Sequence, residues 1–228
     1  MIHIYVSEID VLDKEEVFKE KLDFVHTQRR MKVLRCKNTE DKKRSLMAGL
    51  LLRRAIENEN LNYETLGVTE GAYGKPLYYY QTKNGERVSI GVSISHAKDK
   101  VAVAFSLDET EFGIDIENMN IRFQYTTKDM KRLDSVLSKC MSKKEGEYYQ
   151  NLSGEYKETI DYAGRLWTRK EAYAKTTGVG LGMDFSRIET IEDENSKVHK
   201  FETIMMDGYH LSIYNGKGSI EYQLHILC

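Results

Sequence analysis

The sequence predicts an α+β protein made of two halves that meet near residue 110. Three observations support this class: a strand-like pattern opens the chain, helical patterns follow it, and a second run of strands, helices and strands completes it. Strands and helices that occur in separate runs, rather than in strict alternation, favour the α+β class. A chain of 228 residues has room for one large domain or two small ones.

The first half combines strand and helix patterns. Residues 2–8 alternate between apolar and polar side chains, which indicates a strand. A helix is expected to begin near Thr39, a suitable N-cap, because the acidic residues that follow favour the positive end of a helix dipole. The stretch GAYGKPLYYY (71–80) has turn chemistry and contains the only proline of the chain. The other elements expected in this half are a helix over 13–25 and strands over 87–95 and 101–106.

The second half opens with the strand pattern FGIDIE (112–117). The glycine-rich stretch GVGLG (178–182) follows a helix rather than a strand, so it is expected to be a helix C-cap and loop, not a dinucleotide-binding motif. The polar stretch 142–161 is expected to be an exposed loop or a helix extension, and its role cannot be inferred. The other expected elements are helices near 126–139 and 162–177 and strands over 209–215 and 219–227.

Composition favours a cytoplasmic protein. The longest apolar stretches are far too short to span a bilayer, and the first ten residues lack the basic and apolar regions of a signal peptide. The three cysteines are odd in number and show no C-x-x-C spacing, which argues against disulfides or a thiolate zinc site. We therefore expect a monomer in a reducing cytoplasm, without membrane or nucleic-acid partners.

Positive charge is concentrated between Arg29 and Arg54. This window carries a formal charge of +8, although the whole chain carries −2. A local basic field in a mildly acidic protein suggests a compact polyanionic ligand or an acidic partner surface more than general nucleic-acid binding. The alternative is a solvated helix face with flanking lysines.

Two carboxylates lie two positions apart in the strand pattern 112–117. Residues i and i+2 of a strand point to the same face, so Asp115 and Glu117 project side by side. Like charges at this distance repel unless something positive lies between them. The pattern indicates either a site for a hard cation or an exposed strand with a solvated polar face.

The helix pattern LWTRKEAYAK offers a third carboxylate. Its residues Trp167, Glu171 and Lys175 fall at i, i+4 and i+8, along one helix face. A surface Glu–Lys pair beside a buried tryptophan would explain this spacing. If Glu171 meets the two strand carboxylates, the three would form an oxygen-ligand set of the kind that Mg²⁺ prefers. His96, at the end of the strand pattern SISH, is as well suited to a structural role as to a phosphate contact.

Four motifs in this order resemble the surfactin-synthetase-type 4′-phosphopantetheinyl transferases. They are GKP (74–76), SISH (93–96), GIDIE (113–117) and WTRKEAYAK (167–175). The resemblance implies a holo-acyl-carrier-protein synthase that transfers the phosphopantetheine arm of coenzyme A to a serine of an apo carrier protein. It implies Mg²⁺, release of adenosine 3′,5′-bisphosphate, and a role in fatty acid, polyketide or non-ribosomal peptide biosynthesis.

The resemblance also implies a fold and a set of site residues. The fold would be two similar halves in a pseudo-twofold arrangement: residues 1–110 would contact the adenosine phosphates of coenzyme A, and residues 111–228 would carry the magnesium site and the carrier-facing surface. Asp115, Glu117 and Glu171 match the metal-binding acids, and Lys175 matches the lysine near the pyrophosphate. Glu171 is the first candidate to accept the serine proton, directly or through a metal-bound water, so Glu171 and Lys175 are the catalytic candidates. The positions that match coenzyme A contacts are Arg29, Lys32, Arg44, Ser45, Gly74, Lys75, Pro76, Ser95, His96 and Lys175.

Two other functions are compatible with the same residues. A magnesium-dependent phosphodiesterase or nuclease would also need clustered carboxylates and a basic groove, although a stronger positive field over the whole chain would be expected. A non-catalytic module that binds coenzyme A or a carrier would need no costly cluster of acids.

Overall fold

The computed structural model describes residues 1–122, 126–179, 182–192 and 199–227, and it confirms the α+β class. The chain forms two compact units. The first is Met1–Glu111 together with the chain from Glu221 onward, and the second is Phe112–Ile220. Within the described residues, no helix is both long enough and apolar enough to cross a bilayer.

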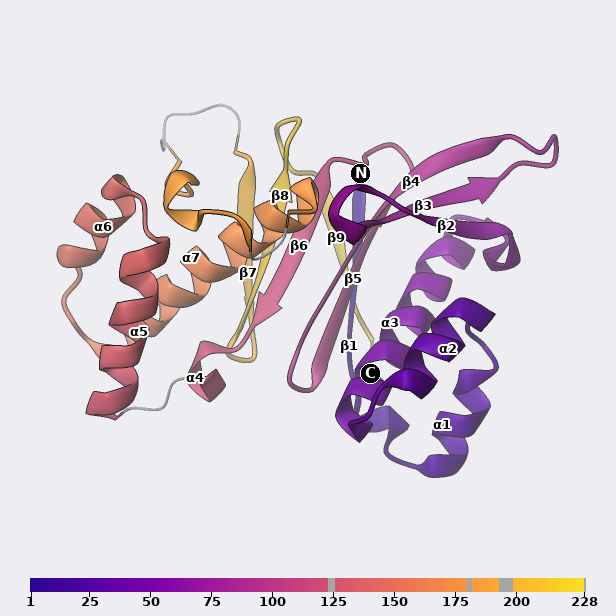
Figure 1. Ribbon diagram of the computed structural model, residues 1–228, viewed down its shortest axis with the longest axis horizontal. Coiled ribbons are helices and arrows are strands. Elements are labelled where there is room, and N and C mark those ends of the chain that lie inside the picture. The colour runs from indigo at the N-terminus through magenta and orange to yellow at the C-terminus, as the bar shows by residue number, and fades with distance from the viewer. Residues whose placement is uncertain (123–125, 180–181, 193–198, 228) are drawn as a thin grey trace. The chain divides into compact units, whose positions relative to one another are not determined.

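The first unit is a six-stranded sheet with the strand order β2-β3-β4-β5-β1-β9 (Figure 1). Apolar side chains of α3, among them Leu46 and Leu51, are buried in one core with Val103 and Phe105 of β5. The strands are β1 (Ile2–Glu8), β2 (Leu66–Glu70), β3 (Pro76–Gln81), β4 (Arg87–Ala97), β5 (Lys100–Ser106) and β9 (Tyr222–Leu227), and the helices are α1 (Glu15–Leu22), α2 (Thr27–Arg35) and α3 (Thr39–Asn58).

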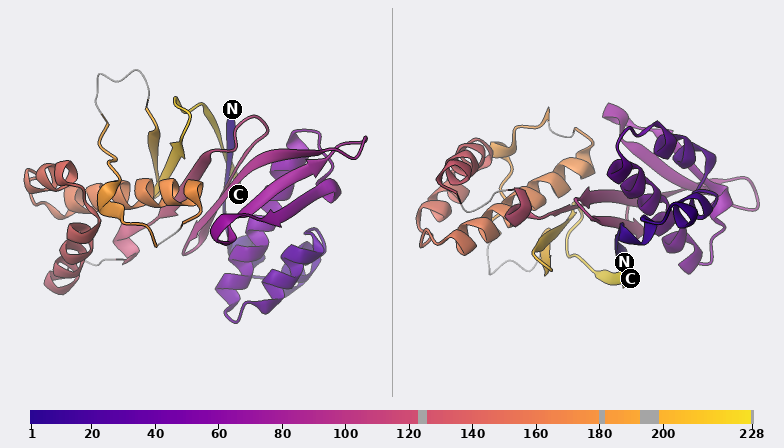
Figure 2. Two further views of the ribbon diagram at one scale, coloured as in Figure 1. Left: turned by 45° about the horizontal axis from the view of Figure 1, so that its top comes forward. Right: turned by 90° about the horizontal axis from the view of Figure 1, so that it is seen from below.

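The second unit is a three-stranded sheet with the order β6-β8-β7, and the long helix α7 packs against it (Figure 2). Helix α7 ends at Gly178, whose φ of 81° is left-handed, so the expected C-cap is confirmed. The strands are β6 (Phe112–Glu117), β7 (Phe201–Met206) and β8 (Tyr209–Asn215), and the helices are α4 (Met119–Arg122), α5 (Thr127–Cys140), α6 (Lys143–Gln150) and α7 (Tyr156–Thr177).

Several elements differ from the sequence prediction. The N-cap of α3 is Asn38, whose side chain accepts a hydrogen bond from the Glu40 amide, and Thr39 is already helical. Strand β3 begins at Pro76, so only the first part of the stretch 71–80 is a turn; a proline is tolerated as the first residue of a strand. The strand near the C-terminus, expected in the second half, pairs in parallel with β1 in the first unit.

The stretch 142–161 contains the additional helix α6, a short and mostly exposed loop at 151–155, and the predicted helix extension at 156–161. Ser142 and Glu145 form a capping box that begins α6, and residues 156–161 are the first turns of α7. The Glu145 side chain is fully buried and accepts a hydrogen bond of 2.5 Å from the equally buried Lys170 ammonium. This ion pair anchors α6 to the middle of α7.

Candidate active site

One face of β6 lies against α7. Gly113, Asp115 and Glu117 alternate along the strand and so share this face. At Gly113 the contact is so close that an added Cβ would lie 2.1 Å from the Ala172 carbonyl oxygen. Glycine is therefore required there, because any side chain would push the helix away from the strand.

Asp115 and Lys175 form an ion pair between strand and helix. The Lys175 ammonium donates a hydrogen bond of 2.8 Å to Oδ1 of Asp115. The Asp115 residue is only 6% exposed, whereas Lys175 is half-buried. Burying a charged carboxylate is costly unless a group of opposite charge pairs with it, and the Lys175 ammonium is such a group. The structure thus brings together two of the residues singled out from the sequence.

Glu171 lies on the same helix face as Lys175, one turn earlier. One turn earlier again, Thr168 contacts Ser212 at 2.6 Å, and Ser212 pairs across the sheet with Asp115. On α7, Glu171 therefore lies between Thr168, which contacts Ser212, and Lys175, which contacts Asp115. Trp167 is half-buried and packs edge-on against Phe185, with 5.9 Å between ring centroids.

Among the residues that the structure describes, no group of three or more His, Cys, Asp or Glu side chains is arranged to hold a metal ion. Asp115 lies against the Lys175 ammonium. Glu117 is half-buried at the end of β6.

A buried histidine lies beside Glu117, and the sequence analysis did not identify it. His210 on β8 pairs with Glu117, and its Nε2 lies 3.1 Å from Oδ1 of Asp161 on α7. Gly164 leaves room for the imidazole, since an added Cβ would lie 2.3 Å from the ring. Burial lowers the pKa of His210, and the Asp161 carboxylate partly opposes that shift. Sequence reasoning weighed His96 alone, because no local pattern marks a histidine inside a strand as buried.

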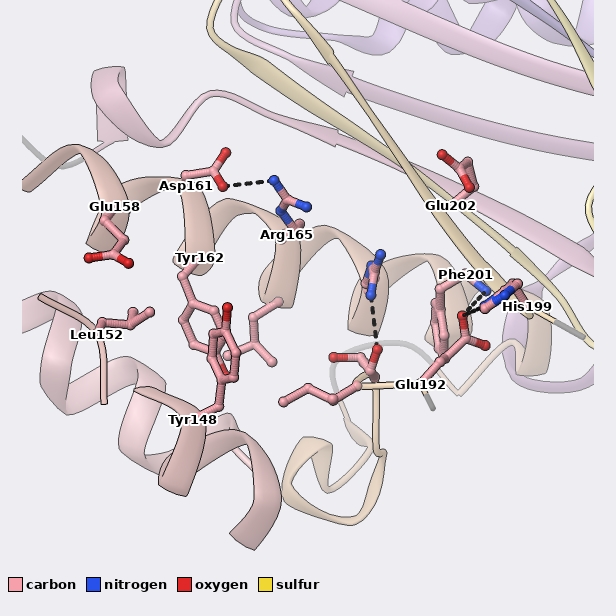
Figure 3. Close-up of a pocket in the computed structure, with 14 residues that line it drawn as sticks. Tyr148, Leu152, Glu158, Asp161, Tyr162, Arg165, Glu192, His199, Phe201 and Glu202 are labelled. Carbon is pink, nitrogen blue, oxygen red and sulfur yellow. Dashed lines mark hydrogen bonds and ion pairs between the residues drawn. The ribbon is translucent and has the colours of Figure 1, made fainter. Parts of the chain in front are cut away.

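The second unit also contains a pocket on another face of α7 (Figure 3). Its volume is about 640 Å³, and Tyr148, Tyr162, Arg165 and Glu192 are among the residues that line it. Arg165 forms an ion pair of 2.9 Å with Asp161 there. The sequence did not predict this pocket, because it requires α6 to be folded beside α7.

In the first unit, Arg29 connects α2 with α3 and β3. Its side-chain stem packs against Gly49, where an added Cβ would lie 2.8 Å from Cγ of Arg29. Burial raises the pKa of Tyr78, and the charge of Arg29 and a hydrogen bond with it oppose that shift. Tyr78 lies on β3 just after Pro76, so Arg29 faces the strand that follows the GKP motif. Lys32 is exposed one turn further along α2.

Arg44 connects α3 with the turn between β4 and β5. Its guanidinium donates a hydrogen bond of 2.6 Å to the Lys98 carbonyl and pairs with Asp41 at 2.5 Å. Lys98 lies two positions after His96, which is exposed near the end of β4. The adjacent Ser45 is 9% exposed, and its hydroxyl has no hydrogen-bond partner among the described residues.

The first two residues of the GKP motif belong to a tight loop, and Pro76 begins β3. Gly74 has a φ of +78°, a left-handed conformation that favours glycine. The Gly71 amide donates a hydrogen bond of 2.7 Å to the Lys75 carbonyl, which closes the loop. Lys75 is half-buried; burial lowers the pKa of its ammonium, and the Glu111 carboxylate opposes that shift. Ser95 is buried on β4.

Strand β6 is tied to helix α7 by the ion pair of Asp115 with Lys175, and the first unit carries exposed cations such as Lys32. Residues 111–223 match the model of the 4′-phosphopantetheinyl transferase superfamily, and residues 13–108 match that of the 4′-phosphopantetheinyl transferase N-terminal domain. The chain belongs to the 4′-phosphopantetheinyl transferase superfamily.

Individual relatives agree with this assignment. The chain is 28% identical over 178 residues to the Bacillus subtilis 4′-phosphopantetheinyl transferase ffp, a match that covers 78% of this chain and 70% of the relative. It is 25% identical over 182 residues to the Paxillus involutus 4′-phosphopantetheinyl transferase pptA, covering 77% and 67%. It is also 25% identical over 173 residues to the mouse L-aminoadipate-semialdehyde dehydrogenase-phosphopantetheinyl transferase, covering 74% of this chain but only 54% of the relative. The chain thus spans about half the length of the mouse protein.

Proposed function

We propose that this protein transfers the 4′-phosphopantetheine arm of coenzyme A to a serine of an apo acyl or peptidyl carrier protein and releases adenosine 3′,5′-bisphosphate. Family membership supports this reaction over both halves of the chain. The observation that carries the proposal is the contact of Lys175 with Asp115, because it joins two motif residues of strand and helix. Membership of a transferase family does not favour a phosphodiesterase or a purely binding module.

Residues of the first unit would bind the adenosine phosphates. Arg29, Lys32 and Arg44 offer three cations for charge-assisted hydrogen bonds to the 3′-phosphate. The buried hydroxyl of Ser45 would gain a partner in a phosphate oxygen, which would remove the cost of a buried polar group without a hydrogen bond. Ser95, His96 and the loop residues Gly74, Lys75 and Pro76 would hold the rest of the nucleotide.

The second unit fits a magnesium ion by the chemistry of its donors. Carboxylate oxygens are the ligands that Mg²⁺ prefers, and β6 and α7 together supply three carboxylates. Asp115, Glu117 and Glu171 would hold the ion. When bound, Mg²⁺ would supply positive charge that stabilises the oxygens of the reacting pyrophosphate.

The protein's own side chains would perform the remaining steps. The serine oxygen forms a bond to the β-phosphorus of coenzyme A, and the bond from that phosphorus to the bridging oxygen breaks. Glu171 would accept the serine proton, because it lies on the face of α7 that packs against β6. Lys175 would stabilise the charge that develops on the pyrophosphate oxygens.

Intact-protein mass spectrometry tests this proposal. Incubation of the protein with coenzyme A, Mg²⁺ and an apo carrier should add the mass of one phosphopantetheinyl group to the carrier. A carrier in which the acceptor serine is replaced by alanine should stay unmodified. An unchanged wild-type carrier, tested across fatty acid, polyketide and non-ribosomal peptide carriers, would exclude the proposed transfer.

We also propose the branch of the family to which the protein belongs, its cellular compartment and its oligomeric state. The motifs favour the surfactin-synthetase-type branch, and the free thiols of Cys36 and Cys140 are compatible with a reducing cytoplasm. A cytoplasmic monomer remains the expectation, and size-exclusion chromatography with light scattering tests the oligomeric state. Relative transfer rates across the three carrier classes would identify the pathway served.

A further inference from the structure

Helix α7 contacts a row of three side chains across the sheet of the second unit. Ser212 on β8 pairs with Asp115 on one side and with Thr203 on the other. Directly opposite residues of antiparallel strands point to the same face, so all three face the helix. The contacts from α7 are Lys175 Nζ to Asp115 Oδ1 at 2.8 Å, Thr168 Oγ1 to Ser212 Oγ at 2.6 Å, and Arg169 Nε to Thr203 Oγ1 at 3.0 Å.

The hydroxyl groups of Thr203, Ser212 and Thr168 form a chain of hydrogen bonds that all run in the same direction. Arg169 can only donate, so Thr203 accepts from it. Thr168 donates to the Gly164 carbonyl at 2.7 Å, so it accepts from Ser212. The single hydroxyl proton of Ser212 is then used, so Thr203 donates its own proton to Ser212 across 2.9 Å. Each hydroxyl therefore donates once and accepts once. The chain begins and ends on α7 and passes through both β7 and β8.

The link between Thr168 and Ser212 is fully buried, which makes it costly to lose, whereas Thr203 and Arg169 are half-buried. Thr168 and Ser212 are 0% exposed. Without one hydroxyl, its neighbour would keep a polar group that water cannot reach. Arg169 is held at the charged end by a second hydrogen bond of 2.9 Å from Nη1 to the Thr190 carbonyl.

We propose that Arg169, Thr203, Ser212 and Thr168 are positioning residues that hold α7 in the register that brings Glu171 and Lys175 to Asp115. Thr168, Glu171 and Lys175 share one helix face, so a slide or rotation at Thr168 moves the other two. A shift by one residue displaces a helix by about 1.5 Å, and a misplacement of about 1 Å can cost on the order of a hundredfold in rate. The kinetic part of this inference rests on the proposed transfer reaction.

Three single variants test the positioning role. Thr168→Val removes the hydroxyl but keeps the shape, Thr168→Ser keeps the hydroxyl, and Ser106→Ala, the control, removes a fully buried hydroxyl of the first unit that accepts a hydrogen bond of 3.1 Å from the Glu109 amide. Thr168→Val should lower kcat about tenfold or more, while KM for coenzyme A stays within about twofold. Thr168→Ser should keep kcat near the wild-type value. Ser106→Ala should lower Tm by a few degrees and leave kcat unchanged.

Three results would contradict the proposal. One is a wild-type kcat in Thr168→Val. Another is an equal loss of kcat in Thr168→Val and Ser106→Ala, because the loss would then follow general destabilisation rather than the register of α7. A low kcat in Thr168→Ser, with Tm kept, would also contradict a role of the hydroxyl.

A melting experiment tests the hydrogen-bond chain without any activity assay. Thr168→Val and Ser212→Ala break the same chain, so the double variant should unfold at about the temperature of the worse single variant. Fully additive shifts in Tm would show that the hydroxyls act independently and would refute the chain. If the wild-type protein modifies no carrier, the proposed function fails, and this melting cycle still decides whether the chain exists.

Discussion

Replacing Asp115 by asparagine tests whether this carboxylate acts in the reaction or only stabilises the fold. The change is nearly isosteric, and it removes the negative charge that faces the Lys175 ammonium at 2.8 Å. The amide oxygen of the new side chain can still accept the hydrogen bond, so only the ionic part of the interaction is lost. Because Lys175 is partly exposed, water screens that part, and we expect a loss of about 1 kcal/mol. For a protein of this size that corresponds to a fall in Tm of roughly 2–4 °C.

The same substitution should affect turnover far more than stability. Loss of a main charge-stabilising group lowers kcat by on the order of a hundredfold or more. The assay is the initial rate of carrier modification across a magnesium titration, and excess Mg²⁺ should restore part of the rate. Asp184→Asn is a matched control, since it removes the charge of an exposed acid that pairs with Arg187 at 3.0 Å. Near-normal turnover of Asp115→Asn at every Mg²⁺ concentration would refute the reasoning.

Other parts of the molecule support three further predictions. The double substitution of Arg29 and Arg44 by alanine should raise KM for coenzyme A more than it lowers kcat. Dephospho-coenzyme A, which lacks the 3′-phosphate, should react more weakly than coenzyme A. Equal kinetics for these two substrates would contradict the proposal that the two arginines bind the 3′-phosphate. Glu145→Gln should cost about 3 kcal/mol, or roughly 10 °C in Tm, because it leaves the fully buried Lys170 without a charged partner; an unchanged Tm would contradict this. The pKa of His210 in the folded protein lies below its ordinary value of 6.5, so the unfolded chain binds more protons in this range. The free energy of unfolding should therefore fall as pH drops through 6.5 and below. His210→Gln should flatten this dependence, which is measured as Tm between about pH 7.5 and 5.

Local sequence patterns predicted much of the fold. The alternation in FGIDIE gave a strand whose bounds match β6, since one face of that strand is apolar and the other packs against α7. The pairing of β9 with β1 was missed, because pairing between distant strands leaves no local signal. The capping box at Ser142 was present in the sequence as S-x-x-E, yet the polar composition around it outweighed that signal.

The candidate site was only partly accessible from the sequence. Spacing placed Glu171 and Lys175 on one face of a helix, and that helix does contact Asp115 through Lys175. Spacing alone did not indicate that Lys170, the neighbour of Glu171, forms a buried ion pair with Glu145, which lies 25 positions earlier in the sequence. The hydroxyl chain was also missed, because Thr168, Thr203 and Ser212 are common polar residues whose role appears only when the strands are paired.

The fate of the phosphopantetheine arm tests the central claim most directly. One reaction with coenzyme A, Mg²⁺ and an apo carrier should be analysed for three products: carrier-bound phosphopantetheine, free phosphopantetheine and adenosine 3′,5′-bisphosphate. We predict that the bisphosphate appears in equal amount to the modified carrier, and that Glu171→Gln slows both together. Release of the bisphosphate with free phosphopantetheine and an unmodified carrier would identify a hydrolase and contradict the account.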